Sequence, residues 1–196
     1  MCKIRDSDAA PEESRPAQYG GVKFEELSTV AFSRALEPAA RAIYSRLWPG
    51  CRVEYLRNED GSPHTLDQNF GVDALVVLPS GQYLTAQEKY RDNDALKYAD
   101  FTQEYKNGDG SDGEWFHLAA QVYFYGWANK AGNDFEKWFL LSIPKYKLLV
   151  EAAGGLREMG QFRKNNKHGK ASFYCIPPEK IQSAFLTDYR QFEGAE

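Results

Sequence analysis

The hydrophobic and polar positions of this chain of 196 residues predict an alternation of helices and strands. Residues 24–48 carry apolar side chains at helical spacing, which predicts a helix that Pro38 either kinks or divides into two. Residues 72–78 form a branched apolar run, and residues 82–90 alternate between apolar and polar side chains. Because the turn-forming sequence Pro79-Ser80-Gly81 separates these two runs, we expect a β-hairpin here.

The remaining segments predict further short elements. In chain order we expect strands at 51–56, 96–105, 135–143 and 171–176, helices at 115–130, at 144–153 and after Pro177-Pro178, and loops at 57–63, 107–113 and 160–170. The aromatic content of residues 115–130 also permits a strand. Together these elements indicate an α/β fold with a mixed central β-sheet flanked by helices.

The predicted hairpin carries the most informative polar residues of the chain. Side chains alternate between the two faces of a strand, so Gln87 and Lys89 share one face and Glu88 lies on the other. Asp73 begins the first strand and would lie close to both of them. A carboxylate, an amide oxygen and an ammonium group at one spot are suited to metal-assisted phosphodiester hydrolysis. The structural alternatives are a turn cap for Asp73 and a solvated strand end for Lys89.

This pattern of Asp73, Gln87 and Lys89 resembles the PD-(D/E)XK nuclease superfamily, whose core hairpin carries an Asp and then an acid-x-Lys. Gln87 stands where the family usually has Asp or Glu, and some members carry such a Gln. The resemblance covers the region 24–130 and implies a restriction-endonuclease-like core. It implies that Asp73, Gln87 and Lys89 are catalytic, that Asp73 and Gln87 bind Mg²⁺, and that Lys89 neutralises charge and orients water. Mn²⁺ would substitute for Mg²⁺, and DNA is the expected partner.

The neutral side chain of Gln87 leaves the expected metal site with one negative charge fewer, so we expect another acid to contribute. Glu104, in the third predicted strand, is one candidate, and an ordinary surface acid is its alternative. The superfamily often contributes a glutamate from a helix before the hairpin. Glu25 or Glu26 would take this role, with Glu37 as a third option, although acids at a helix start also favour the helix dipole.

Gln121 and Tyr125 are four residues apart and would share one face of the predicted helix at 115–130. This Q-x-x-x-Y spacing, placed after the Q-x-K motif, resembles an extra motif of the RecB-like branch that helps to bind the substrate strand. The alternative is an aromatic core helix.

The net charge of −4 gives no support for non-specific nucleic-acid binding by the chain as a whole. Residues 137–170, however, contain eight positive and two negative side chains. We expect the basic loop in this region to contact the substrate backbone, although a solvated face is the alternative. The residues concerned are Arg163, Lys164, Lys167 and Lys170.

We expect residues 1–20, which are polar and contain proline, to form a flexible N-terminal tail before a single nuclease-like domain at 21–196. No apolar run approaches the roughly 20 residues of a membrane span, so we expect no membrane partner. The three cysteines form neither a C-x-x-C pair nor an even set, which favours a reducing, cytoplasmic location.

The leading hypothesis is therefore a divalent-metal-dependent nuclease, with DNA as substrate, in restriction, repair, recombination or mobile-element biology. The main alternative is an inactive module of the same fold that binds nucleic acid or a protein partner, which the neutral Gln87 and the acidic net charge favour. An unrelated α/β enzyme is a third option. Many members of the superfamily are dimers, so a homodimer is expected by analogy only.

Overall fold

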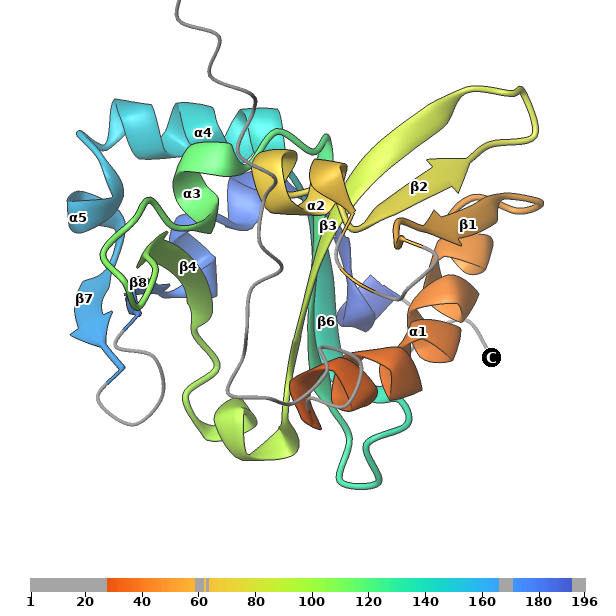
Figure 1. Cartoon of the computed structure of the whole chain (residues 1–196), viewed down its shortest axis with the longest axis horizontal. Helices are drawn as coiled ribbons and strands as arrows, with labels where there is room; N and C mark the ends of the chain where they lie inside the picture. Colours follow the sequence, from red (N-terminus) through yellow and green to blue (C-terminus); the bar gives the residue numbers. More distant parts are fainter. Residues whose placement is uncertain (1–27, 59–61, 63, 166–170, 192–196) are drawn as a thin grey trace, which may run out of the picture.

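A computed structural model describes residues 28–58, 62, 64–165 and 171–191 of the chain. These residues form a central sheet of six strands and a second sheet of three strands, with helices around them (Figure 1). The main helices are α1 (Ser28–Leu47), α2 (Thr65–Phe70), α3 (Glu114–His117), α4 (Ile143–Ala152) and α5 (Leu156–Met159). The strands are β1 (Arg52–Tyr55), β2 (Ala74–Val77), β3 (Tyr83–Arg91), β4 (Phe101–Lys106), β5 (Val122–Ala128), β6 (Phe135–Ser142), β7 (Gln161–Lys164), β8 (Ser172–Ile176) and β9 (Phe185–Asp188). Short 3₁₀ turns are η2 (Asn93–Lys97), η3 (Pro178–Lys180), η4 (Gln182–Ala184) and η5 (Tyr189–Gln191).

The central sheet has the strand order β1-β2-β3-β5-β6-β9 and is mixed. Strands β1, β2 and β3 form an antiparallel meander, β5 is parallel to β3, and β6 and β9 continue antiparallel. The second sheet has the order β4-β8-β7 and is antiparallel. The predictions of a mixed central sheet flanked by helices and of the hairpin β2–β3 are confirmed.

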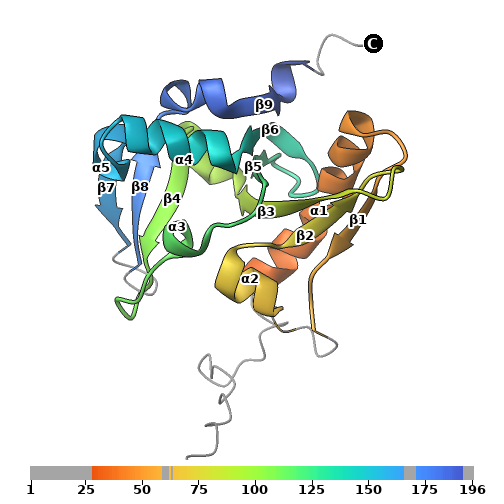
Figure 2. The same cartoon turned by 90° about the horizontal axis from the view of Figure 1, so that it is seen from above.

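The central sheet separates two apolar cores, because successive side chains of β5 point to opposite faces. On one face, Phe124 packs with Tyr44 of α1. On the other face, Tyr123 and Tyr125 pack with Phe101 of β4, which also contacts α4. Figure 2 shows α1 on one side of the sheet and α4 on the other. The face toward β4 and α3 carries the candidate site.

The predicted helix at 115–130 is wrong for most of its length. Only Glu114–His117 is helical, and Val122–Ala128 is strand β5, in which every side chain is buried. Gly126 is required there, because an added Cβ would lie 2.5 Å from Cδ1 of Phe135. The reason for the error is that a strand buried on both faces shows no alternation of apolar and polar residues.

Three other predictions need correction. The segment predicted as a strand at 96–105 begins as the 3₁₀ turn η2, and strand β4 starts only at Phe101 and pairs in the second sheet. The first part of the predicted basic loop at 160–170 is strand β7. Helix α1 continues through Pro38, so the proline does not divide it. Helix α2 and strand β9 were not predicted at all.

Candidate functional site

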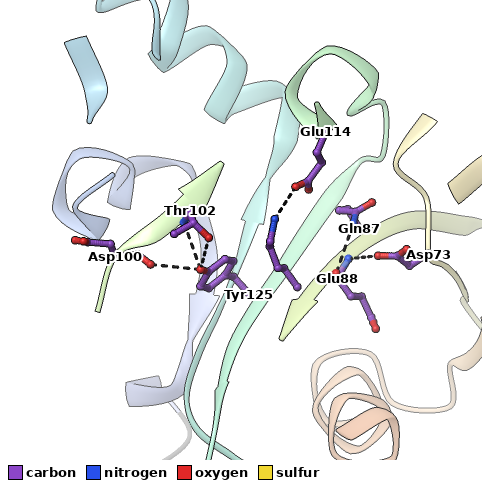
Figure 3. Close-up of polar contacts among 8 residues, drawn as sticks. Asp73, Gln87, Glu88, Asp100, Thr102, Glu114 and Tyr125 are labelled. Atoms are coloured by element: carbon purple, nitrogen blue, oxygen red, sulfur yellow. Dashed lines mark hydrogen bonds and ion pairs between the residues drawn. The ribbon is translucent and has the colours of Figure 1, made fainter. Parts of the chain in front are cut away.

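Asp73 lies immediately before β2 and is held by the backbone of β3. Its N–H donates to the carbonyl oxygen of Ala86 at 2.8 Å, and its Oδ2 accepts from the N–H of Glu88 at 2.7 Å (Figure 3). The carboxylate therefore contacts the backbone between Gln87 and Lys89. The structure brings Asp73 to the Q-x-K segment, as the sequence predicts.

A second acid, which no sequence motif singles out, lies beside Asp73. The carboxyl group of Asp67, in α2, lies close enough to that of Asp73 for the two to share a hydrogen bond when one of them is protonated. Burial raises the pKa of Asp73 well above its usual value, and the negative charge of Asp67 raises it further. Burial also raises the pKa of Asp67. Two neighbouring carboxyl groups that are both withdrawn from water need either a shared proton or a cation.

The short helix α2 explains why Asp67 reaches Asp73. His64 caps its start, with Nδ1 accepting from the N–H of Leu66 at 3.2 Å, and Gly71 ends it in the left-handed conformation at φ 55°. This glycine reverses the chain within a few residues, so that a helical acid and a strand acid lie together. The signal in the sequence was the glycine that follows six residues of helix-compatible sequence.

The amide oxygen of Gln87 is buried and has no hydrogen-bond partner in the described structure. It lies against Gly71, where an added Cβ would be 3.1 Å from Oε1. The Nε2 atom of Gln87 is 3.5 Å from the carbonyl oxygen of Glu88. An unpaired buried acceptor is costly, so this oxygen is available to a cation or to a donor group of a ligand.

The ammonium group of Lys89 forms an ion pair with Glu114 of α3, with Nζ and Oε2 3.1 Å apart. Burial alone would lower the pKa of Lys89, but the negative charges of Glu114 and Glu104 outweigh it and raise this pKa above its usual value. Lys89 therefore remains positively charged at neutral pH. Oε1 of Glu114 is buried without a hydrogen-bond partner in the described residues.

Gln87 and Lys89 line an open cavity of about 590 Å³ together with Asp67, Glu104 and Glu114. Glu104 reaches this cavity from β4. The sequence predicted a strand next to the hairpin in the same sheet, whereas β4 belongs to the second sheet. Burial raises the pKa of Glu104, and the charge of Lys89 opposes that rise. The predicted third acid is therefore near the lysine, whereas Asp67 is the acid in contact with Asp73.

Glu88 turns away from Gln87, as the alternation predicts (Figure 3). Its carboxylate accepts a hydrogen bond from the hydroxyl of Tyr90, and the hydroxyls of Tyr44 and Tyr55 are close to it. Burial raises the pKa of Glu88, and these hydroxyl groups oppose the rise. Glu88 is thus a half-buried acid whose carboxylate lies among tyrosine hydroxyl groups near helix α1.

Glu37 of α1 lines a smaller cavity of about 280 Å³ with Asp67, Asp73 and Glu88. It is ion-paired with Arg57. Of the helix acids suggested by the sequence, Glu37 is therefore the one near Asp73 in the described structure. Glu25 and Glu26 lie outside the described residues.

The predicted pair of Gln121 and Tyr125 does not share a helix face. Gln121 lies just before β5, is exposed, and its Oε1 accepts from the N–H of Thr85 at 3.0 Å. Tyr125 is fully buried, with its hydroxyl 2.9 Å from Oγ1 of Thr102 (Figure 3). Neither residue lines the cavity of Gln87 and Lys89. The Q-x-x-x-Y spacing therefore comes from a strand that is buried on both faces, not from a helix.

The basic residues Arg163 and Lys164 are exposed on β7 and line a separate cavity. Lys167 and Lys170 lie outside the described residues. The predicted basic group is therefore only half described, and its described half does not border the cavity of Gln87 and Lys89.

No match to known proteins was found. Neither a protein-family model, a curated protein nor a solved structure matches this chain. None of the helices in the described part of the chain is long and apolar enough to cross a membrane. The function of the site can therefore be inferred only from the residues that form it.

The donor atoms at this site are oxygens, which are the ligand type that a hard divalent cation prefers. Among residues 28–58, 62, 64–165 and 171–191, no three side chains of His, Cys, Asp or Glu are grouped so that they could hold a metal ion. Asp67 and Asp73 nevertheless supply two carboxyl groups, and Gln87 supplies an unpaired amide oxygen. Mg²⁺ prefers oxygen ligands of these types and keeps several waters, so it needs few protein ligands.

Proposed function

We propose that this protein is a divalent-metal-dependent nuclease that hydrolyses phosphodiester bonds, with DNA as the substrate. The observation that carries the proposal is the pair of neighbouring carboxyl groups of Asp67 and Asp73, of which Asp73 accepts a hydrogen bond from the backbone N–H of Glu88, between Gln87 and Lys89. A half-buried pair of this kind is suited to exchange its proton for a cation beside an ammonium group.

In this proposal, Asp67, Asp73 and the Oε1 atom of Gln87 would hold Mg²⁺, for which Mn²⁺ would substitute. The bound cation would activate water and stabilise the departing oxygen. Lys89 neutralises negative charge on the phosphate and orients the attacking water, because it stays protonated beside Glu114. Glu114 is a positioning residue that fixes the direction of the Lys89 side chain.

The fold is consistent with this proposal. A mixed sheet with the hairpin β2–β3 beside helix α1 is the arrangement that the PD-(D/E)XK resemblance implies, and the restriction-endonuclease-like core is part of the proposal. A reducing, cytoplasmic setting also belongs to it, since the two described cysteines, Cys51 and Cys175, are free thiols. The homodimer expected by analogy stays a prediction.

A second candidate function is a nuclease-fold module without activity that binds nucleic acid. The neutral Gln87 favours it, and so does the grouping of two acids rather than three at the site. Under this alternative the carboxyl pair would keep its proton, and Lys89 would serve only to balance Glu114.

A cleavage assay separates the two functions. Purified protein would be incubated with supercoiled, linear, single-stranded and branched DNA and with RNA, in Mg²⁺, Mn²⁺ or EDTA. We expect metal-dependent cleavage that Asp73→Asn and Lys89→Ala each reduce by at least 100-fold. Glu136→Gln is the matched control, because it neutralises an exposed acid on β6 outside the cavity. Equal cleavage by wild type and both site variants would reject the assignment.

A further inference from the structure

A cavity of about 300 Å³ lies beside the end of β3, beyond Lys89. Its walls combine positive and aromatic side chains that come from both sheets. The positive residues are Arg91, Arg163 and Lys164, and the aromatic residues are Tyr98, Trp127 and Phe173. This volume is at the lower end of the range for small-ligand sites, so it suits one nucleotide unit.

The charge of this cavity is opposite to that of the chain. Asp100 is the single acid among its described lining residues, against three positive side chains, whereas the whole chain has a net charge of −4. Asp100 is also close enough to Arg163 for the arginine charge to oppose the rise of its pKa that burial causes. A local excess of positive charge in an acidic protein favours an anionic ligand such as a phosphate.

The aromatic walls provide surfaces for a planar ring. Trp127 lines the cavity from the core side, because it is only 4% exposed and its ring packs edge-on against Tyr125 with 4.9 Å between centroids. Tyr98 is 69% exposed, and Nζ of Lys97 lies 5.1 Å from its ring centroid. Ala99, next to Tyr98, has φ 51°, a strained conformation that is unusual for a residue with a side chain. Strain of this kind occurs where a protein fixes a group for binding.

The cavity is lined by a residue on the same strand as the proposed catalytic lysine. Arg91 and Lys89 are two residues apart on β3, so their side chains leave the same face of the strand. Their Cα atoms are therefore separated by roughly 6.6 Å, at about 3.3 Å per residue. The cavities at Lys89 and at Arg91 have no lining residue in common, so each would hold a separate part of one nucleic-acid strand.

We infer that this cavity binds one unpaired nucleotide of a single-stranded nucleic acid, with its base against the exposed ring of Tyr98 and its phosphate between Arg91 and Arg163. Stacking on aromatic side chains together with backbone neutralisation is the usual basis of single-strand binding. A base inside a duplex is stacked between its neighbours and does not present its face to such a wall. The link to cleavage at Lys89 rests on the proposed nuclease function, but the binding itself does not.

The test measures binding without cleavage. A fluorescently labelled oligothymidylate of eight nucleotides and a hairpin duplex would be titrated with full-length protein in EDTA by anisotropy, at several salt concentrations. The variants are Tyr98→Ala, which removes an exposed ring, and Arg91→Gln with Arg163→Gln. Lys130→Gln with Arg157→Gln is the control, because it changes the charge equally at exposed positions outside the cavity.

We expect the single strand to bind more tightly than the duplex. Loss of the Tyr98 ring should weaken single-strand binding by roughly 5-fold to 150-fold, the range for one stacked base. The double arginine variant should reduce the slope of log affinity against log salt by about 0.7 for each phosphate that is no longer neutralised. The control pair should leave the single-strand preference unchanged.

Equal binding of the duplex and the single strand, or unchanged affinity in both cavity variants, would overturn the inference. Circular dichroism and urea unfolding would establish that each variant is folded. Single-strand binding that Tyr98→Ala weakens, in a protein that cleaves nothing, would support the cavity and reject the nuclease. Cleavage that depends on Asp73 but is indifferent to Tyr98 and the arginines would do the reverse.

Discussion

Replacement of Asp67 by Asn tests the central feature of the site, which is the coupling between the carboxyl pair and a cation. Asp73 is buried beside Asp67, and both effects raise its pKa. Two carboxylates about 4 Å apart repel each other by about 4 kcal/mol at an effective dielectric constant of 20. Asp67 keeps some exposed surface, so we expect its replacement to relieve about 1 to 2 kcal/mol of this repulsion and to lower the pKa of Asp73 toward its ordinary value.

The sign of the pH dependence follows from proton binding. A carboxyl group with a raised pKa in the folded state binds more protons when folded than when unfolded. The wild-type protein should therefore lose stability as pH rises from about 4, the pKa of an unfolded aspartate, through the raised pKa of Asp73. The Asp67→Asn substitution should make this loss of stability smaller and shift it to lower pH.

Metal binding provides the second readout. A cation that displaces the proton of the pair should bind more tightly as pH rises, and protons should be released on binding at pH values where the pair is protonated. Titration calorimetry with Mn²⁺ in buffers of different ionisation enthalpy counts these protons, and urea unfolding between pH 4 and 8 gives the stability. Glu136→Gln serves as the control.

The result that would refute this reasoning is metal binding with no proton release and no pH dependence in the wild-type protein. An Asp67→Asn variant with the wild-type stability profile between pH 4 and 8 would refute it equally. Either result would mean that the carboxyl pair does not share a proton when no cation is bound.

Three further predictions concern single contacts. Gln87→Glu should tighten Mn²⁺ binding at least tenfold in calorimetry, because a carboxylate replaces a neutral amide, and unchanged affinity would exclude Gln87 as a ligand. Glu114→Gln removes the ion pair of Lys89, so the pKa of Lys89 should fall and the alkaline limit of cleavage should move to lower pH. Urea unfolding should show a loss of stability of up to about 3 kcal/mol. An unchanged alkaline limit would contradict the role assigned to Glu114. Gly126→Ala should lower the free energy of unfolding by about 1 to 3 kcal/mol in thermal or urea unfolding, because its Cβ would lie 2.5 Å from the ring of Phe135. Adding Phe135→Leu to the same chain should restore part of this stability. An equal loss in the double variant would mean that the clash with Phe135 is not the cause.

The hairpin is the part of the site that local sequence alone predicts. Alternation along β3 places Gln87 and Lys89 on one face, and the turn after β2 brings Asp73 close to them. Both results depend only on strand geometry and turn chemistry, which act over a few residues. The same locality explains why helix α1, strand β6 and helix α4 were predicted close to their observed bounds.

Contacts between distant segments decided the rest. Strand β5 is buried on both faces between two cores, so its uniform run of apolar residues could not distinguish it from a helix until β3 and β6 paired with it. Strand β4 belongs to the second sheet because β8, some seventy residues later, pairs with it. The partner of Asp73 is Asp67 because Gly71 reverses the chain between them, and the partner of Lys89 is Glu114 because helix α3 packs beside β4. A sequence pattern records which side chains share a face, whereas the charge that each buried carboxyl group meets is set only when separate segments pack together.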